Sequence, residues 1–417
     1  MRPVIPPAVM AAALLAALPA FAQSPPPAPG SSTTVHSTDT PSAPVPPDRP
    51  GGRPWHDWAS MSGDWGGART WLAQRGFEIT AEHTADLSSS RVDGQHGARG
   101  LRGLTVVGAT LDLEALVPHA RGWRASVQFM QKGGRDGGAC QISAQGFSNI
   151  DTDSFAGRGE AWVEGHLAGE RLRLKVGRVD ANSEFAYVEH GGEFINPSVG
   201  VSPTLFLLPT YPEPAASVNV VLEPGGGLYS ATGLYNGRPA LGDSGVGTPF
   251  VIQEAGAAWD SGRLGVGAWH HSGTFERPDG SRSQGTTGTY AVFDQSVWAG
   301  INGAGEPALA GVFVQAGWAD GEVSEITRHV GVGITTQGLV PWRPRDRAGL
   351  AASVVHFGAC AATAAPAGRE TNVGGFYAVP LAEWLWLKSD LQIVSHPAGR
   401  VSGSPAVMGT MRLQVVF

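Results

Sequence analysis

The sequence predicts an all-β protein, a transmembrane antiparallel β-barrel of about 16 strands preceded by a short N-terminal helical segment. Three observations predict this fold class. From Phe77 onward, polar and apolar residues alternate, which is typical of strands with one wet face and one apolar face. Short and long connections alternate between these strands. The chain also ends on such a strand, Gly409–Phe417, whose last residue is aromatic, as suits an outer-membrane barrel.

Composition sets the broad class of protein. The chain has 417 residues, of which 42% are hydrophobic and 16% charged, enough to build a large core or to line a wide barrel. The net charge of −7 argues against a nucleic-acid partner, because no stretch concentrates the Lys and Arg needed to follow a phosphate backbone. We therefore expect no binding of DNA or RNA.

Residues 1–22 have the pattern of a secretory signal peptide. Arg2 supplies the positive charge, Val9–Leu18 is the apolar run, and Ala20-Phe21-Ala22 is a small-x-small cleavage site. An uncleaved membrane anchor is the alternative, although the apolar run is short for a helix that crosses a bilayer. Since no other stretch offers about twenty consecutive apolar residues, any membrane crossing must be made by strands.

The rest of the chain divides into two parts. Residues 23–60 form a Pro-rich spacer, in which Gln23–Arg53 is too polar and too rich in proline to build a core. Residues 61–417 form the expected outer-membrane barrel domain. Its first element is a short helix over Ala68–Arg75 that stops at Gly76.

The first and last strands show the expected faces most clearly. On the first strand, Phe77–Leu87, apolar residues occupy alternate positions, and His83 alone interrupts their side. On the last strand, the lipid-facing positions are Met411, Leu413, Val415 and Phe417, and the lumen-facing positions are Thr410, Arg412 and Gln414. We expect these two strands to pair, because their pairing closes the sheet and removes both exposed edges.

The connections predict which end of the barrel faces which compartment. Short turns are expected at Pro118–Gly122, Ala168–Glu170 and Asp260–Gly262, and long loops at Ser88–Gly103, Lys132–Arg158, Asp180–Ala215 and Gly273–Gly285. A barrel inserted from the periplasm has small periplasmic turns and long external loops. A secreted soluble β-protein that binds or hydrolyses glycans is the alternative, because a soluble sandwich shows the same alternation of residues.

The hairpin Glu160–Arg178 is the best candidate for the wall of a polar lumen. If Gly169 and Glu170 form its turn, three inward pairs and one outward pair result. The inward pairs are Glu164 with Lys175, His166 with Arg173, and Trp162 with Gly177, and the outward pair is Leu167 with Leu172. Opposed charges across a water-filled channel orient hydroxyl groups, which suits a neutral polyol better than an ion. The alternative is that these residues are ordinary solvated wall charges.

The long loop Asp180–Ala215 is the expected constriction, because a barrel of this strand count otherwise leaves a wide lumen. It mixes carboxylates and amides with aromatic rings, the usual components of a carbohydrate site. A loop that packs for structural reasons alone is the alternative. The candidate pore-lining or sugar-contact residues of the hairpin and the loop are Glu160, Trp162, Glu164, Arg171, Arg173, Lys175, Asp180, Asn182, Glu184, Phe185 and Glu193.

Enzymatic motifs are missing from the sequence. It contains no Gly-x-Ser-x-Gly, no His-Glu-x-x-His and no Gly-Lys-Ser or Gly-Lys-Thr phosphate loop. A glycosidase that uses Glu160 and Glu164 is the remaining enzymatic alternative. We expect no catalytic residues, no cofactor and no metal.

Cys140 and Cys360 are the only two cysteines. Both fall on external loops in the predicted topology, and the export route is oxidising. We therefore expect a disulfide that joins two external loops above the pore.

Several segments from Met61 to Phe417 also carry a family resemblance. They are Gly63–Gly76, Asn182–Phe185, Glu193–Asn196, Leu208–Pro212, Gly233–Gly237, Tyr290–Gln295, Gly338–Arg343 and Asp390–Gln392. In this order they resemble the carbohydrate-selective porins of the OprB family of Gram-negative outer membranes. The resemblance implies a porin, surrounded by outer-membrane lipids and assembled as a homotrimer, through which small sugars diffuse passively.

Overall fold

The structure is a computed structural model, and it describes residue 48 and residues 52–92, 95–135, 142–237, 248–277, 279–303, 305–359, 368–401 and 403–417. The predicted signal peptide, residues 1–22, and most of the predicted spacer, residues 23–60, lie outside the described residues. Cys140 and Cys360 lie outside them too, so the disulfide stays a prediction.

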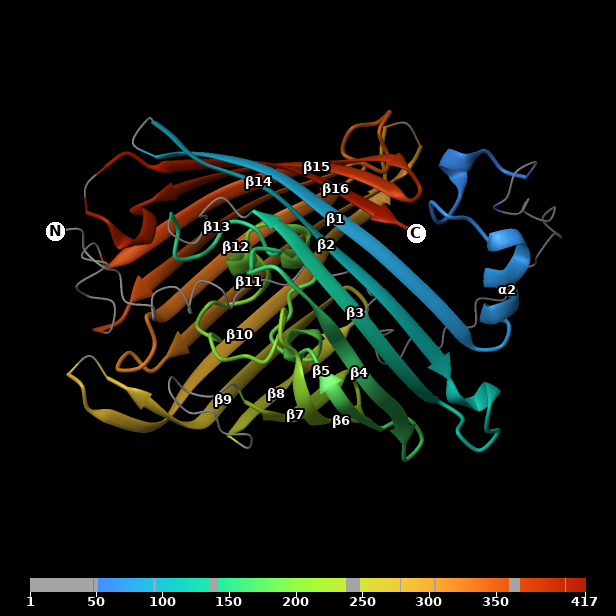
Figure 1. Cartoon of the computed structure of the whole chain (residues 1–417), viewed down its shortest axis with the longest axis horizontal. Helices are drawn as coiled ribbons and strands as arrows, with labels where there is room; N and C mark the ends of the chain where they lie inside the picture. Colours follow the sequence, from blue (N-terminus) through green and yellow to red (C-terminus); the bar gives the residue numbers. More distant parts are fainter. Residues whose placement is uncertain are drawn as a thin grey trace.

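Sixteen strands form a closed antiparallel barrel in the described part of the chain (Figure 1). They are β1 Phe77–Val92, β2 Gln95–Asp112, β3 Trp123–Arg135, β4 Phe155–Leu167, β5 Leu172–Val179, β6 Ala215–Gly225, β7 Leu228–Asn236, β8 Pro249–Trp259, β9 Gly262–Glu276, β10 Arg282–Ile301, β11 Pro307–Ala319, β12 Ile326–Gln337, β13 Arg347–Phe357, β14 Arg369–Ala382, β15 Leu385–Ser395 and β16 Ala406–Val416. Each strand pairs with its sequence neighbours, and β1 pairs with β16. The predicted fold class is confirmed.

The helices are short. Before the barrel come η1 Trp55–Asp57, η2 Trp65–Gly67 and α2 Ala68–Ala73, and between strands lie η3 Leu113–Ala115, η5 Ala181–Ser183, η6 Gly191–Glu193, α3 Pro197–Gly200 and η8 Pro397–Gly399. The position of α2 confirms the predicted N-terminal helical segment. Among the described residues, no helix has both the length and the apolar character needed to cross a membrane.

The seam between β1 and β16 has the register needed to close the sheet. Leu87 lies opposite Met411, and Asp86 lies opposite Arg412. Met411 is exposed on the outer surface, whereas Asp86 and Arg412 are buried inside the barrel. The predicted pairing of the first and last strands and the predicted faces of these residues are confirmed.

The predictions of long loops at Ser88–Gly103 and Gly273–Gly285 are wrong. Ser88–Gly103 continues the ladder between β1 and β2, which leaves residues 93 and 94 alone between the two strands. Likewise β9 and β10 extend into Gly273–Gly285 and leave residues 277–281 as their connection. These segments are rich in Ser and Gly, residues that predict loops locally, but pairing with the neighbouring strand overrides this preference.

The interior of the barrel is filled in part by two connections. The chain between β5 and β6, residues 180–214, folds inside the ring of strands and is called here the constriction loop (Figure 1). Its Phe185 and Leu208 are buried in one apolar cluster with Tyr235, Phe250 and Trp269 of the wall. Residues 142–154, called here the second inner loop, come before β4 and bury Phe147 and Ile150. No local pattern in the sequence predicts this second inward segment.

Candidate functional site

The hairpin of β4 and β5 has the predicted register. Glu164 lies opposite Lys175, His166 opposite Arg173 and Trp162 opposite Gly177, while Leu167 lies opposite Leu172. The turn between the strands contains Gly169 and Glu170, both with positive φ, as a tight hairpin turn requires. Alternation along the strands and the position of the turn therefore determine the inward pairs, and both features can be found in the sequence.

Charged side chains from three strands and the constriction loop form a continuous chain of ion pairs, called here the charge ladder. Arg124 of β3 contacts Glu164 at 2.9 Å, and Glu164 contacts Arg173 at 2.9 Å. Glu184 of the constriction loop then contacts Arg173 at 2.6 Å and Lys175 at 2.8 Å. Arg124 is exposed and Arg173 partly exposed, whereas Lys175 and Glu184 are enclosed. The ladder thus offers its arginine end to the lumen.

The buried end of the ladder is neutralised by close pairing. Burial alone raises the pKa of the Glu184 carboxyl, but Lys175 and Arg173 outweigh burial and hold this pKa below its usual value. The Lys175 ammonium also lies 4.2 Å from the centre of the Trp162 ring. Glu184 therefore stays ionised and fixes the loop to β5.

Asp180 joins the two ends of the constriction loop. Its carboxylate accepts hydrogen bonds from the Asn182 amide at 2.8 Å, from the Thr210 hydroxyl at 2.7 Å and from the Tyr211 amide at 3.0 Å. Burial, with the nearby Glu160 carboxylate, raises the pKa of Asp180 to about 7. Glu160 in turn accepts a hydrogen bond from the Asp180 amide at 2.9 Å. Both acids hold the root of the loop.

Glu193 lies in a second charged group, called here the far cluster. It contacts Arg347 of β13 at 2.8 Å and Lys388 of β15 at 3.5 Å, and the Arg347 guanidinium lies 4.7 Å from the ring centre of Trp386. Burial raises the pKa of Glu193, but Lys388 and Arg347 outweigh it and lower this pKa. The sequence does not mark Arg347, Lys388 or Trp386 as site residues, although alternation along β15 places Trp386 and Lys388 on the same face.

The two charged groups face each other across the barrel. Arg173 lies on β5 and Arg347 on β13, and these strands stand eight positions apart in the ring of sixteen. Each arginine lies near the start of its strand, at the end of the barrel that carries the short turns. The constriction loop reaches the first group with Glu184 and the second with Glu193.

Wall carboxylates hold the middle of the constriction loop by its backbone. Glu254 of β8 accepts a hydrogen bond from the Ala186 amide at 2.9 Å. Asp294 of β10 accepts hydrogen bonds from the amides of Glu189 at 2.7 Å and His190 at 3.0 Å. Because these bonds use the main chain, they fix the path of the loop whatever side chains it carries.

The second inner loop is held by wall side chains on the other side of the lumen. Arg412 donates to the Asn149 side chain at 2.7 Å, and the Ser148 hydroxyl donates to Asp86 at 2.7 Å. The Gln392 amide donates to the Phe147 carbonyl at 2.9 Å. This loop therefore closes part of the lumen beside β15, β16 and β1.

Polar side chains of the remaining wall stay open to solvent. They are Glu78, Thr80 and Glu82 of β1, Thr110 of β2, Ser126 and Gln128 of β3, and Gln414 of β16. All share the inward face with the buried Asp86 and Arg412 of the same sheet. A hydrated wall thus runs between the charge ladder and the far cluster.

Besides the buried Glu160, Lys175, Asp180 and Glu184, three further candidates do not present their side chains to this wall. Phe185 is fully buried and meets Tyr235 edge-on at 6.4 Å, so its ring is not free to stack on a solute. The Asn182 side chain is used within the loop, where it donates to the Phe185 carbonyl at 3.2 Å. Arg171 lies in the exposed turn between β4 and β5.

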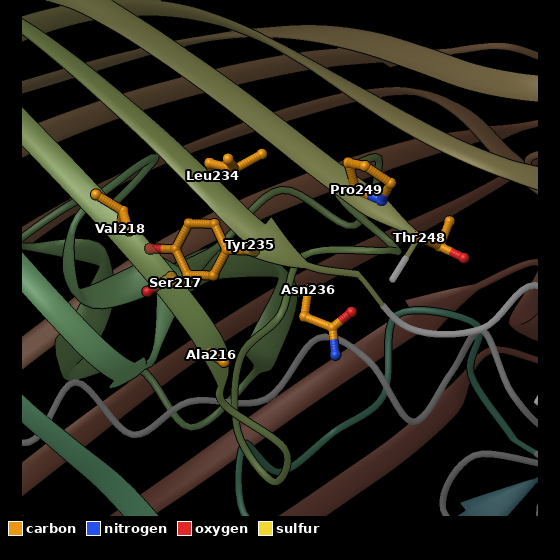
Figure 2. A pocket seen from close by; sticks show the side chains of 8 residues that line it. All are labelled: Ala216, Ser217, Val218, Leu234, Tyr235, Asn236, Thr248 and Pro249. Atoms are coloured by element: carbon orange, nitrogen blue, oxygen red, sulfur yellow. The ribbon is translucent and has the colours of Figure 1, made fainter. Parts of the chain in front are cut away.

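A separate hollow lies at the far ends of β6, β7 and β8 (Figure 2). It is lined by Ala216, Ser217, Val218, Leu234, Tyr235, Asn236, Thr248 and Pro249. These side chains are apolar or uncharged, so the hollow lacks the charge pairs that mark the lumen. Among the described residues, no group of His, Cys, Asp and Glu has the arrangement of a metal site.

A closed barrel that is narrowed by an inward loop and lined by charged side chains defines a porin. The model of the OprB family, carbohydrate-selective porins, matches residues 96–417, and the chain belongs to this family. This confirms the family resemblance found in the sequence. Porins are passive channels, so the protein is not an enzyme.

Solved structures have the same fold. The high-pH structure of OprB from Pseudomonas putida has a TM-score of 0.76 at 16% identity, covering 87% of this chain and 99% of that chain. Its low-pH structure has a TM-score of 0.58 at 17% identity, with the same coverage. The outer-membrane channel DcaP of Acinetobacter baumannii has a TM-score of 0.50 at 9% identity, covering 82% of this chain and 98% of that chain. No curated protein sequence gave a significant match.

Proposed function

We propose that small sugars diffuse through this porin along the hydrated wall, and that the charge ladder and the far cluster contact them on opposite sides. The observation that carries the proposal is the pair of arginines, Arg173 and Arg347, on facing strands at the same end of the barrel. Each arginine is partly exposed while its carboxylate partners hold it in place. Their side chains therefore border the lumen from two opposite sides.

The chemistry of these groups suits a neutral polyol. A guanidinium group donates hydrogen bonds from a fixed plane, and a carboxylate accepts hydrogen bonds. A sugar hydroxyl can therefore accept from the first group and donate to the second. Trp162 and Trp386 are partly exposed and offer ring faces beside these charges, against which the apolar face of a sugar can stack. Each of the two arginines contacts a carboxylate that offsets its charge, so neither group presents an isolated ion to the solute.

The paired state of the carboxylates argues against the glycosidase alternative. A glycosidase needs two carboxyl groups that flank the substrate and are free to act on it. Glu164 is held by Arg124 and Arg173, and Glu160 is buried against the backbone of Asp180. Neither group is free for proton transfer or nucleophilic attack.

We also infer that the chain is exported with a signal peptide, residues 1–22, and forms a homotrimer in the lipids of the Gram-negative outer membrane. Outward apolar side chains such as Leu87, Leu101, Val127 and Leu350 support a lipid or subunit environment. Sequencing the mature N-terminus tests the export step, and the mass of the native complex in detergent tests the trimer. A mature chain that starts at Met1, or a monomeric mass, would contradict the respective inference.

Liposome swelling tests the sugar contacts directly. Arg173→Gln and Trp386→Ala, on opposite sides of the lumen, should each reduce the rate for a hexose relative to a linear neutral solute of similar mass. Arg171→Gln is the matched control, since Arg171 lies in the exposed turn two residues away. Equal rates for both solutes in the unaltered protein, or no effect of either lumen variant, would overturn the proposed contacts.

A further inference from the structure

The segment Gly63–Gly76, one of those that carry the family resemblance, has no part in the lumen. Its local fold is well defined: the Asp64 carboxylate accepts hydrogen bonds from the Thr70 amide at 2.8 Å and from the Thr70 hydroxyl at 2.9 Å. Gly66 and Gly67 have φ of 71° and 101°, which L side chains rarely adopt. The segment therefore forms a hydrogen-bonded turn into α2, and its function lies outside the lumen.

Residues 55–76 are bound to the end of the barrel beside the seam. The Met61 amide donates to the Val416 carbonyl at 2.8 Å, and Arg69 donates to the Phe417 carbonyl oxygen at 2.9 Å. Trp384, in the turn before β15, donates through its indole to the Trp55 carbonyl at 2.9 Å. Figure 1 shows this segment outside the ring of strands, near the end of β16. It is thus fixed at the level of the short turns.

The same segment packs on the outer wall of the barrel. Val415 shares the outward face of β16 with Leu413, yet Leu413 is 37% exposed and Val415 only 9%. The difference arises because Trp58 and Met61 pack in one apolar cluster with Val415. Residues 55–76 therefore occupy part of the surface that lipid covers elsewhere on the barrel.

The outer side of this segment is aromatic and basic. Trp65 is 43% exposed and Trp71 53%, and every residue of α2 remains at least partly exposed. The Arg69 guanidinium lies 4.5 Å from the ring centre of Trp65, and Arg75 lies 4.0 Å from that of Trp71. Exposed indoles next to cations match the boundary between acyl chains and phosphate headgroups.

We propose that residues 55–76 form an interfacial foot, bound to phospholipids of the periplasmic leaflet. Trp65 and Trp71 lie at the boundary with the acyl chains, and Arg75 faces the headgroup phosphates. The occupant is lipid because the segment already covers the lipid-facing wall, and because its free side chains combine apolar rings with positive charge. This binding surface is separate from the sugar path.

Spin labelling of the full-length porin in phospholipid vesicles tests the foot. Cys140 and Cys360 are replaced by Ser, and a label is placed by Trp71→Cys or, to keep both indoles, by Gln74→Cys on the same helix. The matched control is Arg121→Cys, in the exposed turn between β2 and β3. Collision with oxygen reports lipid, and collision with a water-soluble nickel chelate reports solvent.

If residues 55–76 bind lipid, the ratio of oxygen to nickel collisions should be severalfold higher at α2 than at the control. A ratio equal to the control would overturn the proposal, since α2 would then stand in water. Protection from both agents with broadening between labels would also overturn it, because the face would then contact a second copy of the chain. Hexose flux, measured on the same vesicles, reports separately on the sugar proposal and should be unchanged by Trp71→Cys.

Discussion

Glu184 is the single carboxylate that neutralises two cations of β5 at the root of the constriction loop. Its side chain is enclosed, and its partners Arg173 and Lys175 approach within 2.6 and 2.8 Å. Enclosed charges of this kind are costly when one partner is removed, because the other remains buried without compensation. The stability of the loop root therefore depends on this residue more than on the exposed end of the charge ladder.

Glu184→Gln should lower the stability of the folded barrel by about 3–5 kcal/mol, because Lys175 stays buried after losing the carboxylate that it contacts at 2.8 Å. The measurement is the temperature at which the fast-migrating folded band disappears on a gel. Glu170→Gln, in the exposed turn of the same hairpin, is the control and should change little. Equal melting of both variants would contradict the assigned role.

Asp180 gives the loop root a pH dependence of defined sign. Its pKa is about 7 in the folded protein and 3.8 in an ordinary carboxyl, so the folded state binds the extra proton between these values. The contribution of Asp180 to the free energy of unfolding should therefore be complete below pH 3.8 and fall as the pH rises to about 7. Above that pH it should stay level. Asp180→Asn should flatten this slope in thermal unfolding measured across that range, and an unchanged slope would exclude Asp180 as its source.

At the residue scale, the sequence predicts side chains on strands better than side chains in loops. The sequence predicts the strand positions of Trp162, Glu164 and Lys175 correctly, because alternation and one turn define their faces. The bonds of Glu184 to β5 could not be predicted, because a loop has no period that relates its positions to the wall. Phe185 packs in the core instead of lining the lumen for the same reason.

Among the elements, the constriction loop sets the pore, and its path is fixed by main-chain hydrogen bonds. Asp294 accepts two of them, from the amides of Glu189 and His190. Two adjacent amides that share one carboxylate give a short, directional attachment. The middle of the loop is therefore fixed to β10 through one side chain.

Asp294→Ala should release this part of the loop, because two amides lose their acceptor at a cost of about 1–3 kcal/mol each if they stay buried. We expect a larger and noisier single-channel conductance and weaker discrimination between a hexose and a linear solute. Gln295→Ala changes the next residue on β10, whose side chain bonds to Trp259 instead of to the loop, and should leave conductance unchanged. A conductance equal to that of the control variant would contradict the anchoring role.

The sequence predicts the elements of the fold unevenly. The existence of the strands and the inward position of the long loop follow from alternation and from the width of such a barrel. The extensions of β1 and β2 through Ser88–Gly103 do not, because their residues favour strands only when a partner strand is present. The second inner loop, residues 142–154, carries no local signal, since its position depends on contacts with Asp86, Gln392 and Arg412 far along the chain.

At the scale of the whole molecule, the barrel is closed by strands from opposite ends of the sequence. Asp86 of β1 and Arg412 of β16 face each other across this seam with two hydrogen bonds, at 2.7 and 2.8 Å. Both side chains are buried. The sequence predicts the pairing of the two strands, since each is the other's free partner, but the ion pair depends on the register that the closed ring imposes.

Arg412→Met should weaken closure by up to about 3–5 kcal/mol, since the buried Asp86 carboxylate loses its two-bond partner and keeps Arg102, 3.7 Å away, as a nearby cation. The effect should appear as a lower concentration of denaturant at the unfolding midpoint. The double variant Asp86→Asn with Arg412→Met should recover part of the loss, because the two residues interact directly. Simple addition of the two single effects would contradict a coupled seam.

The attachments of the constriction loop also have a mechanical consequence. The loop is bonded to β5, β8, β10, β13 and β15, which are spread around the ring. It therefore links five strands across the lumen, and the second inner loop links the remaining part of the wall, beside β15, β16 and β1. A cross-braced ring resists flattening under lateral pressure, so the size limit for solutes should stay constant when the surrounding membrane is stretched or compressed.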